Sequence, residues 1–181
     1  MLASLTAYAG QGDAETPLPV DDWDPPFCGD IDMRIAYDGA WHYNGTPILR
    51  PSLVRLFARL LRRDGQAYVL VTPVEKVGIT VEDVPFIAVT MNQEDGTLVF
   101  RTGVGDTVAA GPDHPLRFVI DAEGAFVPYV HIRGGLEARL SPSLARDLAA
   151  LAEVADGHLG IRSGNSFFTI GPANQLFDSA G

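Results

Sequence analysis

The segment 129–137 carries the side chains of this sequence that are best suited to recognising a ligand. Tyr129, His131 and Arg133 alternate along it, so a β-strand would present an aromatic ring, an imidazole and a guanidinium on one face. A glycine pair that lets a backbone approach closely follows them, and then Glu137. These groups suit the base, ribose and phosphate of a nucleotide-like ligand, although an ordinary polar sheet surface carries the same residue types.

Three basic residues elsewhere are candidates to hold an anion. Arg50 precedes Pro51, which is a favoured first residue of a helix. An arginine there offers only hydrogen-bond donors, so it is either solvated or placed to meet an anion near the positive end of the helix. Arg34 in a predicted strand and Lys76 in a predicted loop supply further charge.

A pair of aspartates raises the possibility of catalysis. Asp30 and Asp32 flank one residue at strand spacing, so they point the same way and could share a cation or a proton. With His42 or His131 they could act on a phosphorylated small molecule, but they could equally form a solvated strand face or pair with Arg34. No third carboxylate follows at ligand spacing, and the histidines lack zinc spacing. The sequence therefore predicts no catalytic residue, no metal site and no cofactor.

The composition limits the partners and the compartment. The chain has 181 residues, 46% of them hydrophobic, and 13 basic against 23 acidic side chains, for a formal charge of −10. This charge opposes binding to a nucleic-acid polymer. No apolar stretch approaches membrane-spanning length, and the N-terminus lacks the basic region of a secretory signal, so we expect a cytoplasmic protein without membrane contact. The single cysteine, Cys28, excludes an intrachain disulfide, and free cysteines are usually buried, so we expect a buried thiol.

A hairpin turn followed by a proline-started helix occurs twice in the sequence. Pro142 follows Pro51 by 91 residues, whereas Gly124 of the second turn follows Gly39 of the first by only 85. The second copy therefore carries six more residues between its turn and its helix. Such a repeat indicates an internal duplication, and duplicated scaffolds commonly bind a ligand where the copies meet.

Apolar periodicity predicts an α+β fold made of two copies of a strand-strand-helix-strand-strand unit with antiparallel sheets. Helices are expected over Pro51–Arg63 and Pro142–Ala155, and strands at Ala67–Val71, Thr97–Thr102 and Leu116–Ile120, among others. The expected organisation is a flexible N-terminal arm (1–22), a first repeat (23–91), connecting strands and turns (92–115), a second repeat (116–172) and a tail (173–181).

Several stretches resemble an uncharacterised bacterial family, the "domain of unknown function" family 1285. They are Trp23–Ile35 with Asp38–Trp41, Thr72–Lys76, Val81–Phe86 and Pro128–Glu137. The resemblance covers residues 23–172. It implies a duplicated α+β core whose C-terminal half is similar to a pleckstrin-homology-type fold. It also implies a nucleotide-like ligand at the interface of the halves and a role in signal transduction, and it brings no catalytic residues.

These patterns predict a non-catalytic cytoplasmic sensor or regulatory module that binds a small anionic, nucleotide-like ligand between the repeats. Arg50 and the segment 129–137 are expected to line that cleft, and a signalling protein is a further expected partner. Two alternatives stay open: an enzyme acting on a phosphorylated small molecule, and a protein-interaction scaffold that engages a partner chain through its sheet face and N-terminal arm. An enzyme needs a compact acid and base constellation, and a binding module does not.

Overall fold

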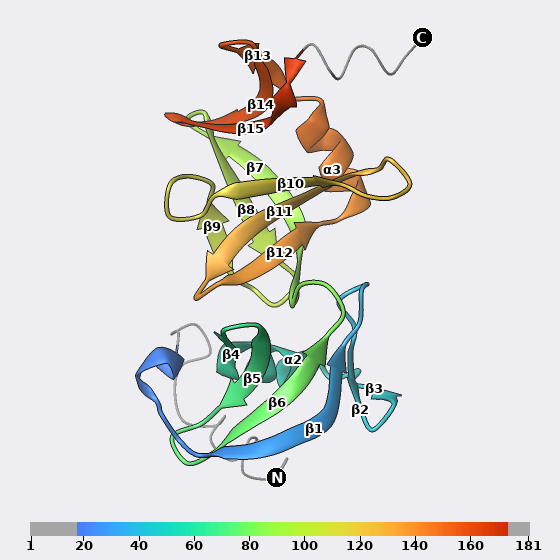
Figure 1. Ribbon diagram of the computed structural model, residues 1–181, viewed down its shortest axis with the longest axis vertical. Helices are drawn as coiled ribbons and strands as arrows, with labels where there is room; N and C mark the ends of the chain where they lie inside the picture. The colour runs from blue at the N-terminus through green and yellow to red at the C-terminus, as the bar shows by residue number, and fades with distance from the viewer. Residues whose placement is uncertain (1–17, 174–181) are drawn as a thin grey trace. The chain divides into compact units, whose positions relative to one another are not determined.

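The structure is a computed structural model that describes residues 18–173 (Figure 1). These residues form two compact units: an N-terminal unit up to Pro85 and a C-terminal unit from Phe86 onward, the short turn 134–136 excepted. Each unit has one α-helix and is built mainly of strands, so the described chain is α+β with two similar halves. Most of the predicted arm (1–17) and tail (174–181) lies outside the described residues.

The N-terminal unit is built on a single six-stranded sheet in the order β3-β2-β1-β6-β5-β4. Neighbouring strands are antiparallel except β1 and β6, which run parallel. Its elements are a short 3-10 helix η1 (Val20–Asp22), β1 (Phe27–Ile35), β2 (Trp41–Tyr43), β3 (Thr46–Pro47), α2 (Pro51–Leu60), β4 (Leu61–Asp64), β5 (Ala67–Val71) and β6 (Lys76–Val81).

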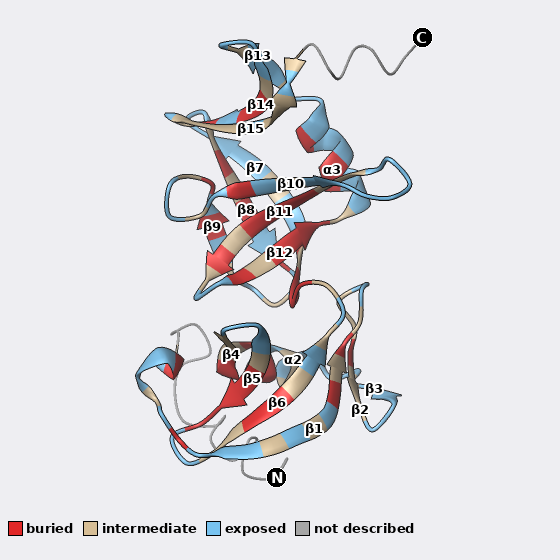
Figure 2. Ribbon diagram, viewed as in Figure 1, coloured by how far each residue is buried: buried red, intermediate tan, exposed pale blue. Residues whose placement is uncertain are grey.

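Helix α2 supplies much of the core of the N-terminal unit. Pro51 occupies its first turn, and the apolar stripe of the helix buries Phe57 and Leu60 completely. The ring of Phe57 stacks on that of Trp41 with the ring centres 6.2 Å apart. In Figure 2 the C-terminal part of β5 is buried and β3 is exposed, because β3 is a short strand at the edge of the sheet.

The C-terminal unit divides its strands between two sheets, of order β10-β11-β12-β7-β8-β9 and β13-β14-β15. The first of these contains a parallel pair, β12 with β7. The elements are β7 (Phe86–Glu94), β8 (Thr97–Thr102), β9 (Thr107–Ala109), β10 (Leu116–Ile120), β11 (Phe126–Arg133), β12 (Leu136–Leu140), α3 (Pro142–Ala149), β13 (Glu153–Ala155), β14 (His158–Ser163) and β15 (Ser166–Pro172). Helix α3 packs against β7 and β11.

The same order of elements occurs in both units. Three strands, a helix and three strands form β1–β3, α2 and β4–β6, and again β10–β12, α3 and β13–β15. Each copy thus has one strand more on either side of the helix than the sequence predicts. Strands β7–β9 precede the second copy and have no counterpart in the first.

Three structural expectations are corrected. Both helices end earlier than predicted, α2 at Leu60 and α3 at Ala149, because the residues that follow pair as β4 and β13. Leu61, which fits the helical stripe, is instead an extended residue paired with Leu70 and fully buried. The two six-stranded sheets are mixed rather than antiparallel, since β6 and β7 each reach the free edge of a strand that runs in the same direction, whereas the β13–β15 sheet is antiparallel as predicted.

Order begins earlier than the sequence predicts. The residues Val20–Asp22, expected to belong to a flexible arm, form η1, and Val20 is buried. In the part of the chain that the structure describes, no helix is long and apolar enough to cross a bilayer.

Candidate functional site

The seven predicted ligand residues are distributed over both units. Arg34, Arg50 and Lys76 belong to the N-terminal unit, and Tyr129, His131, Arg133 and Glu137 belong to the C-terminal unit. That the two sets act on one ligand stays a prediction.

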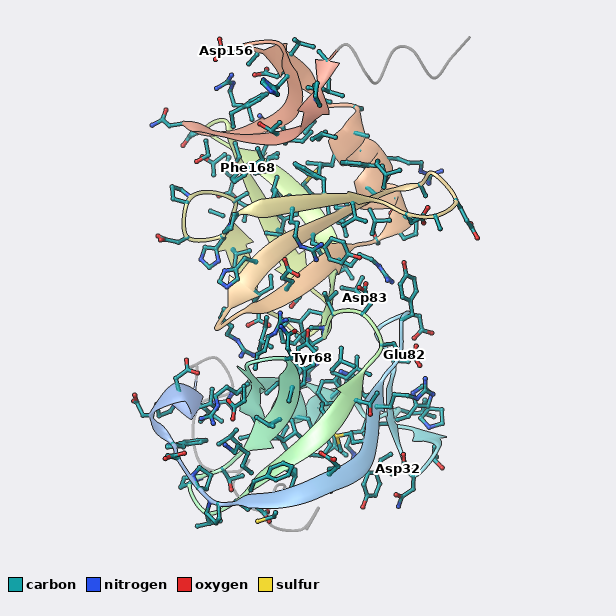
Figure 3. All side chains as sticks on the ribbon, in the orientation of Figure 1. Asp32, Tyr68, Glu82, Asp83, Asp156 and Phe168 are labelled. Carbon is teal, nitrogen blue, oxygen red and sulfur yellow. The ribbon has the colours of Figure 1, made fainter. Side chains whose placement is uncertain are left out.

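Arg34 is held by an acidic residue that the sequence analysis did not consider. Strand pairing places it beside His42 of β2 and Thr80 of β6, and its guanidinium bonds to the carboxylate of Glu82, which follows β6. The other oxygen of Glu82 accepts a bond from the backbone N–H of Tyr37 at 2.7 Å. This bond and then Arg34 lower the pKa of Glu82. Figure 3 labels Glu82 at the end of β6.

Lys76 belongs to a charged cluster on the sheet of the N-terminal unit. Its Nζ lies 2.9 Å from Oδ2 of Asp64, and Arg62 donates to both oxygens of the same carboxylate at 2.7 and 3.0 Å. The Arg62 bond, followed by that of Lys76, lowers the pKa of Asp64 to about 2. Arg62 also donates to the backbone carbonyls of Val20 and Trp23, each at 2.7 Å. The cluster thus ties the start of the described chain to the sheet.

Arg50 is the exposed N-cap residue of α2, and its side chain makes no capping bond. Ser141, the N-cap residue of α3, makes none either, and its Oγ lies 3.3 Å from Oγ of Ser143. Neither N-cap side chain therefore bonds to the backbone of its helix. A ligand-binding role for Arg50 stays a prediction.

The aspartate pair does not pair with Arg34. Asp30 lies opposite Gly78 of β6, and its carboxylate occupies the space that a Cβ of Gly78 would need. The Nδ1 atom of His42 is buried without a hydrogen-bond partner. Within residues 18–173, no three His, Cys, Asp or Glu side chains come together in a group that could hold a metal ion. The enzyme alternative gains no support from this motif.

Cys28 is exposed, so the prediction of a buried thiol is wrong. Its Sγ lies 3.5 Å from the carbonyl oxygen of Pro26. The physical reason lies in the start of β1, where the pairing with β6 shifts register and Gly29 adopts φ +94. The regular alternation that buries Met33 and Ile35 further along β1 does not extend to this end of the strand.

In the C-terminal unit, Tyr129 and Glu137 are joined by Arg117. The guanidinium of Arg117 on β10 lies over the Tyr129 ring, 4.0 Å from its centre. Arg117 also donates from Nε and Nη2 to the two oxygens of Glu137, at 2.9 and 2.7 Å. Tyr129 is only 6% exposed, so its ring is covered and is not available to stack on a base in this arrangement.

Arg117 is not among the predicted site residues, although the sequence contains a signal for it. The turn at Gly124 sets the register of the β10–β11 hairpin, in which Ile120 lies opposite Phe126. Counting back along both strands places Arg117 opposite Tyr129. Cross-strand neighbours share a face, so an arginine–tyrosine contact could have been expected.

Arg133 at the end of β11 is the second oriented guanidinium of this unit. It lies 5.5 Å from the centre of the Phe86 ring, and its Nε is 3.4 Å from Oδ1 of Asp106. This contact is longer than the 2.7–2.9 Å of a typical charge-assisted bond. The carboxylate of Asp106 therefore holds Arg133 less tightly than Glu137 holds Arg117, and 30% of the Arg133 side chain is exposed.

His131 lies between Tyr129 and Arg133 on β11, beside a second histidine that the sequence did not link to it. The ring centres of His114 and His131 are 5.8 Å apart. Aromatic, imidazole and guanidinium groups thus follow one another along β11, as the alternation of Tyr129, His131 and Arg133 suggested. That these three residues form one ligand site stays a prediction.

A separate hollow of about 440 Å³ lies elsewhere in the C-terminal unit, at the tip of the β7–β8 hairpin. Gln93, Asp95 and Gly96 line one side of it, and Glu153 and Arg162 contribute to the other. Arg162 donates to Glu153 at 2.6 Å, so the guanidinium in the hollow is already paired. None of the predicted site residues lines this hollow.

Comparison with known proteins identifies the family. Residues 18–84 match the N-terminal domain of the domain of unknown function DUF1285, and residues 85–170 match the C-terminal domain of the same family. The chain belongs to the DUF1285 family. The resemblance seen in the sequence is thereby confirmed, and the two family domains correspond to the two compact units.

Two crystal structures of DUF1285 proteins are similar to this chain. The protein from Silicibacter pomeroyi is 47% identical, with a TM-score of 0.86, over 96% of this DUF1285 chain and 97% of the other. The protein from Shewanella baltica is 25% identical, with a TM-score of 0.53, over 64% of this chain and 87% of the other. None of the curated proteins matches the chain.

Proposed function

We propose that this DUF1285 protein is a non-catalytic sensor or regulatory module that binds a small anionic, nucleotide-like ligand through its C-terminal unit. The observation that carries the proposal is a pair of guanidinium groups, Arg117 and Arg133, each of which lies over an aromatic ring and contacts a carboxylate. On β11, His131 lies between Tyr129, the ring partner of Arg117, and Arg133 itself.

This arrangement favours recognition of a phosphate. An aromatic ring and a carboxylate restrict each guanidinium before a ligand arrives, so less side-chain freedom is lost on binding. A guanidinium has five N–H donors and matches the oxygens of a phosphate in a bidentate manner. The side chain of Arg133 is 30% exposed, so part of its guanidinium can be reached by an incoming phosphate.

The same proposal includes a pleckstrin-homology-like arrangement of the C-terminal half, a cytoplasmic location and a signalling partner. The fold proposal rests on the mixed six-stranded sheet with α3 packed against β7 and β11. A regulatory role follows if the ligand alters the surface around Arg117 and Arg133, since each would exchange a carboxylate partner for a phosphate.

Binding is tested by isothermal titration and thermal shift against nucleoside mono-, di- and triphosphates and sugar phosphates. Loss of a charge-assisted bond is worth about 1.5 to 3 kcal/mol, so Arg133→Ala should weaken binding about ten- to a hundredfold. Arg146→Ala, on the exposed side of α3, is the matched control and should bind like the parent.

Two results would count against the proposal. The parent protein could show no binding to any of these anions at millimolar concentration. Alternatively, Arg133→Ala could bind the ligand as tightly as Arg146→Ala while losing stability, which would make Arg133 a structural brace of the Phe86 ring rather than a ligand residue.

A further inference from the structure

Two histidines of the C-terminal unit, His114 and His131, connect the segment before β10 to β11 by hydrogen bonds. Nδ1 of His114 lies 3.1 Å from the carbonyl oxygen of His131, and Nδ1 of His131 lies 3.0 Å from the carbonyl oxygen of Asp113. The backbone N–H of His131 also donates to the carbonyl of Pro115 at 3.0 Å. Each ring is therefore oriented by a bond to the backbone of the other segment.

These bonds determine the tautomer of both rings. A carbonyl oxygen only accepts, so Nδ1 of His114 and of His131 must carry the proton and donate it. In the neutral form of each imidazole, the lone pair is then on Nε2. A metal-binding histidine is commonly oriented in this way, with its other ring nitrogen donating to a backbone carbonyl.

The separation of the two rings suits one shared ion. A metal ion lies about 2.0–2.1 Å from an imidazole nitrogen that binds it. The metal is then about 3.2 Å from the centre of that ring. Two rings on one ion therefore have their centres about 5 to 6.4 Å apart, depending on the angle at the metal. The centres of the His114 and His131 rings are 5.8 Å apart, with 31° between the ring planes.

We propose that His114 and His131 bind a divalent transition-metal ion through their Nε2 atoms. Imidazole nitrogens favour Cu²⁺, Ni²⁺ and Zn²⁺ over Mg²⁺ and Ca²⁺, and the affinity of the first group is highest for Cu²⁺. No third His, Cys, Asp or Glu completes a metal-holding group among residues 18–173, so the proposed site has these two imidazoles as its side-chain ligands. The two histidines are 17 residues apart in the sequence, which is why zinc-type spacing does not reveal them.

The test uses the full chain without an affinity tag, freed of metal by a chelator. Calorimetric titration at pH 7.5 with Cu²⁺, Ni²⁺, Zn²⁺ and Mg²⁺ should show one site, tightest for Cu²⁺ and absent for Mg²⁺. His114→Gln and His131→Gln should each weaken Cu²⁺ binding at least tenfold. The matched controls His42→Gln and His158→Gln should bind like the parent.

A measurement on the unaltered protein covers the case in which a variant fails to fold. Substoichiometric Cu²⁺ should broaden the ring-proton NMR signals of His114 and His131 before those of His42 and His158. Equal broadening of all four histidines, or unchanged affinity in a folded His114→Gln/His131→Gln double variant, would overturn the proposal. The inference does not rest on the anion site, because metal is titrated alone and nucleotides are titrated without metal.

Discussion

The two units of this DUF1285 protein contain the same order of strands and helix but join their strands differently. In the N-terminal unit β1 pairs in parallel with β6, which closes all six strands into one sheet. Their counterparts β10 and β15 come near each other without pairing, so β13–β15 form a sheet of their own (Figure 1). The local pattern of a repeat thus specifies its elements, whereas their pairing depends on which strand edges are available.

The third strand of each copy explains much of this difference. In the N-terminal unit β3 has two residues and ends in Pro47, which has no N–H to extend a sheet. Its counterpart β12 has five residues and accepts β7 as a parallel neighbour. The six extra residues in the second copy fall in this region, where β11 is also longer than β2. They let the second unit add β7–β9 to its sheet.

The buried hydroxyl groups that precede the last strand of each copy also differ. In the N-terminal unit the buried Thr72 hydroxyl bonds within its own loop, to the backbone of Glu75. In the C-terminal unit the buried Ser163 hydroxyl donates to the carbonyl of Ala110 at 2.8 Å and accepts from the N–H of Leu98 at 2.9 Å. One hydroxyl stabilises a turn, and the other joins two sheets.

The largest expected effects come from the matched helix positions Phe57 and Leu148, both fully buried. Phe57→Ala should lower the stability of the N-terminal unit by about 4 kcal/mol and Leu148→Ala that of the C-terminal unit by about 3 kcal/mol, through lost burial and a cavity. Both tryptophans, Trp23 and Trp41, are in the N-terminal unit, so their fluorescence in a urea titration follows that unit. Hydrogen exchange in β14 follows the other unit. A loss below 1 kcal/mol in either variant would show that the helices do not form the cores as described.

Strand glycines offer a second comparison. A Cβ on Gly160 would lie 2.5 Å from the carbonyl oxygen of Phe168 and 2.6 Å from the Phe167 ring, so Gly160→Ala should cost about 3 kcal/mol. A Cβ on Gly78 would meet the flexible carboxylate of Asp30, which can turn away, so Gly78→Ala should cost about 1 kcal/mol or less. Urea denaturation measures both. Equal costs would indicate that the surroundings of Gly160 relax as easily as Asp30 does.

Removal of these two buried hydroxyls, of Ser163 and of Thr72, should also have unequal effects on stability. Ser163→Ala leaves a buried N–H and a buried carbonyl without their partner, at a cost of about 2 kcal/mol. Thr72→Ala removes bonds within a single turn and should lower the free energy of unfolding by about 1 kcal/mol. Hydrogen exchange should show the Leu98 amide losing protection in Ser163→Ala only. Protection of that amide in the variant would contradict the proposed link between the sheets.

The smallest effect concerns the acid dependence of the N-terminal unit. The pKa of Asp64 is lowered from 3.8 to about 2, so its contribution is present above pH 4 and is lost as the pH falls toward 2. The lowered pKa alone corresponds to about 2.5 kcal/mol of folding stability. The Asp64 side chain is 31% exposed, however, and solvent screening reduces this contribution to about 1 kcal/mol. Asp64→Asn should lower stability by that amount at pH 7, and the difference from the parent should shrink between pH 4 and 2. Asp95→Asn, on an exposed hairpin turn, is the control; a constant Asp64→Asn difference down to pH 2 would refute the assignment.

Sequence patterns by themselves determined the family, the recurrence of the elements and the local starts and turns of the chain. Pro51 and Pro142 begin helices, and β5, β8 and β10 have the predicted bounds, because a proline at the first helical turn and apolar alternation act over a few neighbouring residues. They also identified β11 as the strand that carries the ring, imidazole and guanidinium side chains.

Only the tertiary structure decided which edges pair and which side chains meet. These contacts join residues that are distant in the sequence or that have several possible partners. They are the β1–β6 and β12–β7 pairs, the bond of Lys76 to Asp64, the contact of Arg117 with the Tyr129 ring, and the contact between His114 and His131. Such contacts depend on the length of each strand and on the free edges that remain when the others have paired. No local pattern of residue types contains that information, because the same repeat unit, placed beside β7–β9, forms two sheets instead of one.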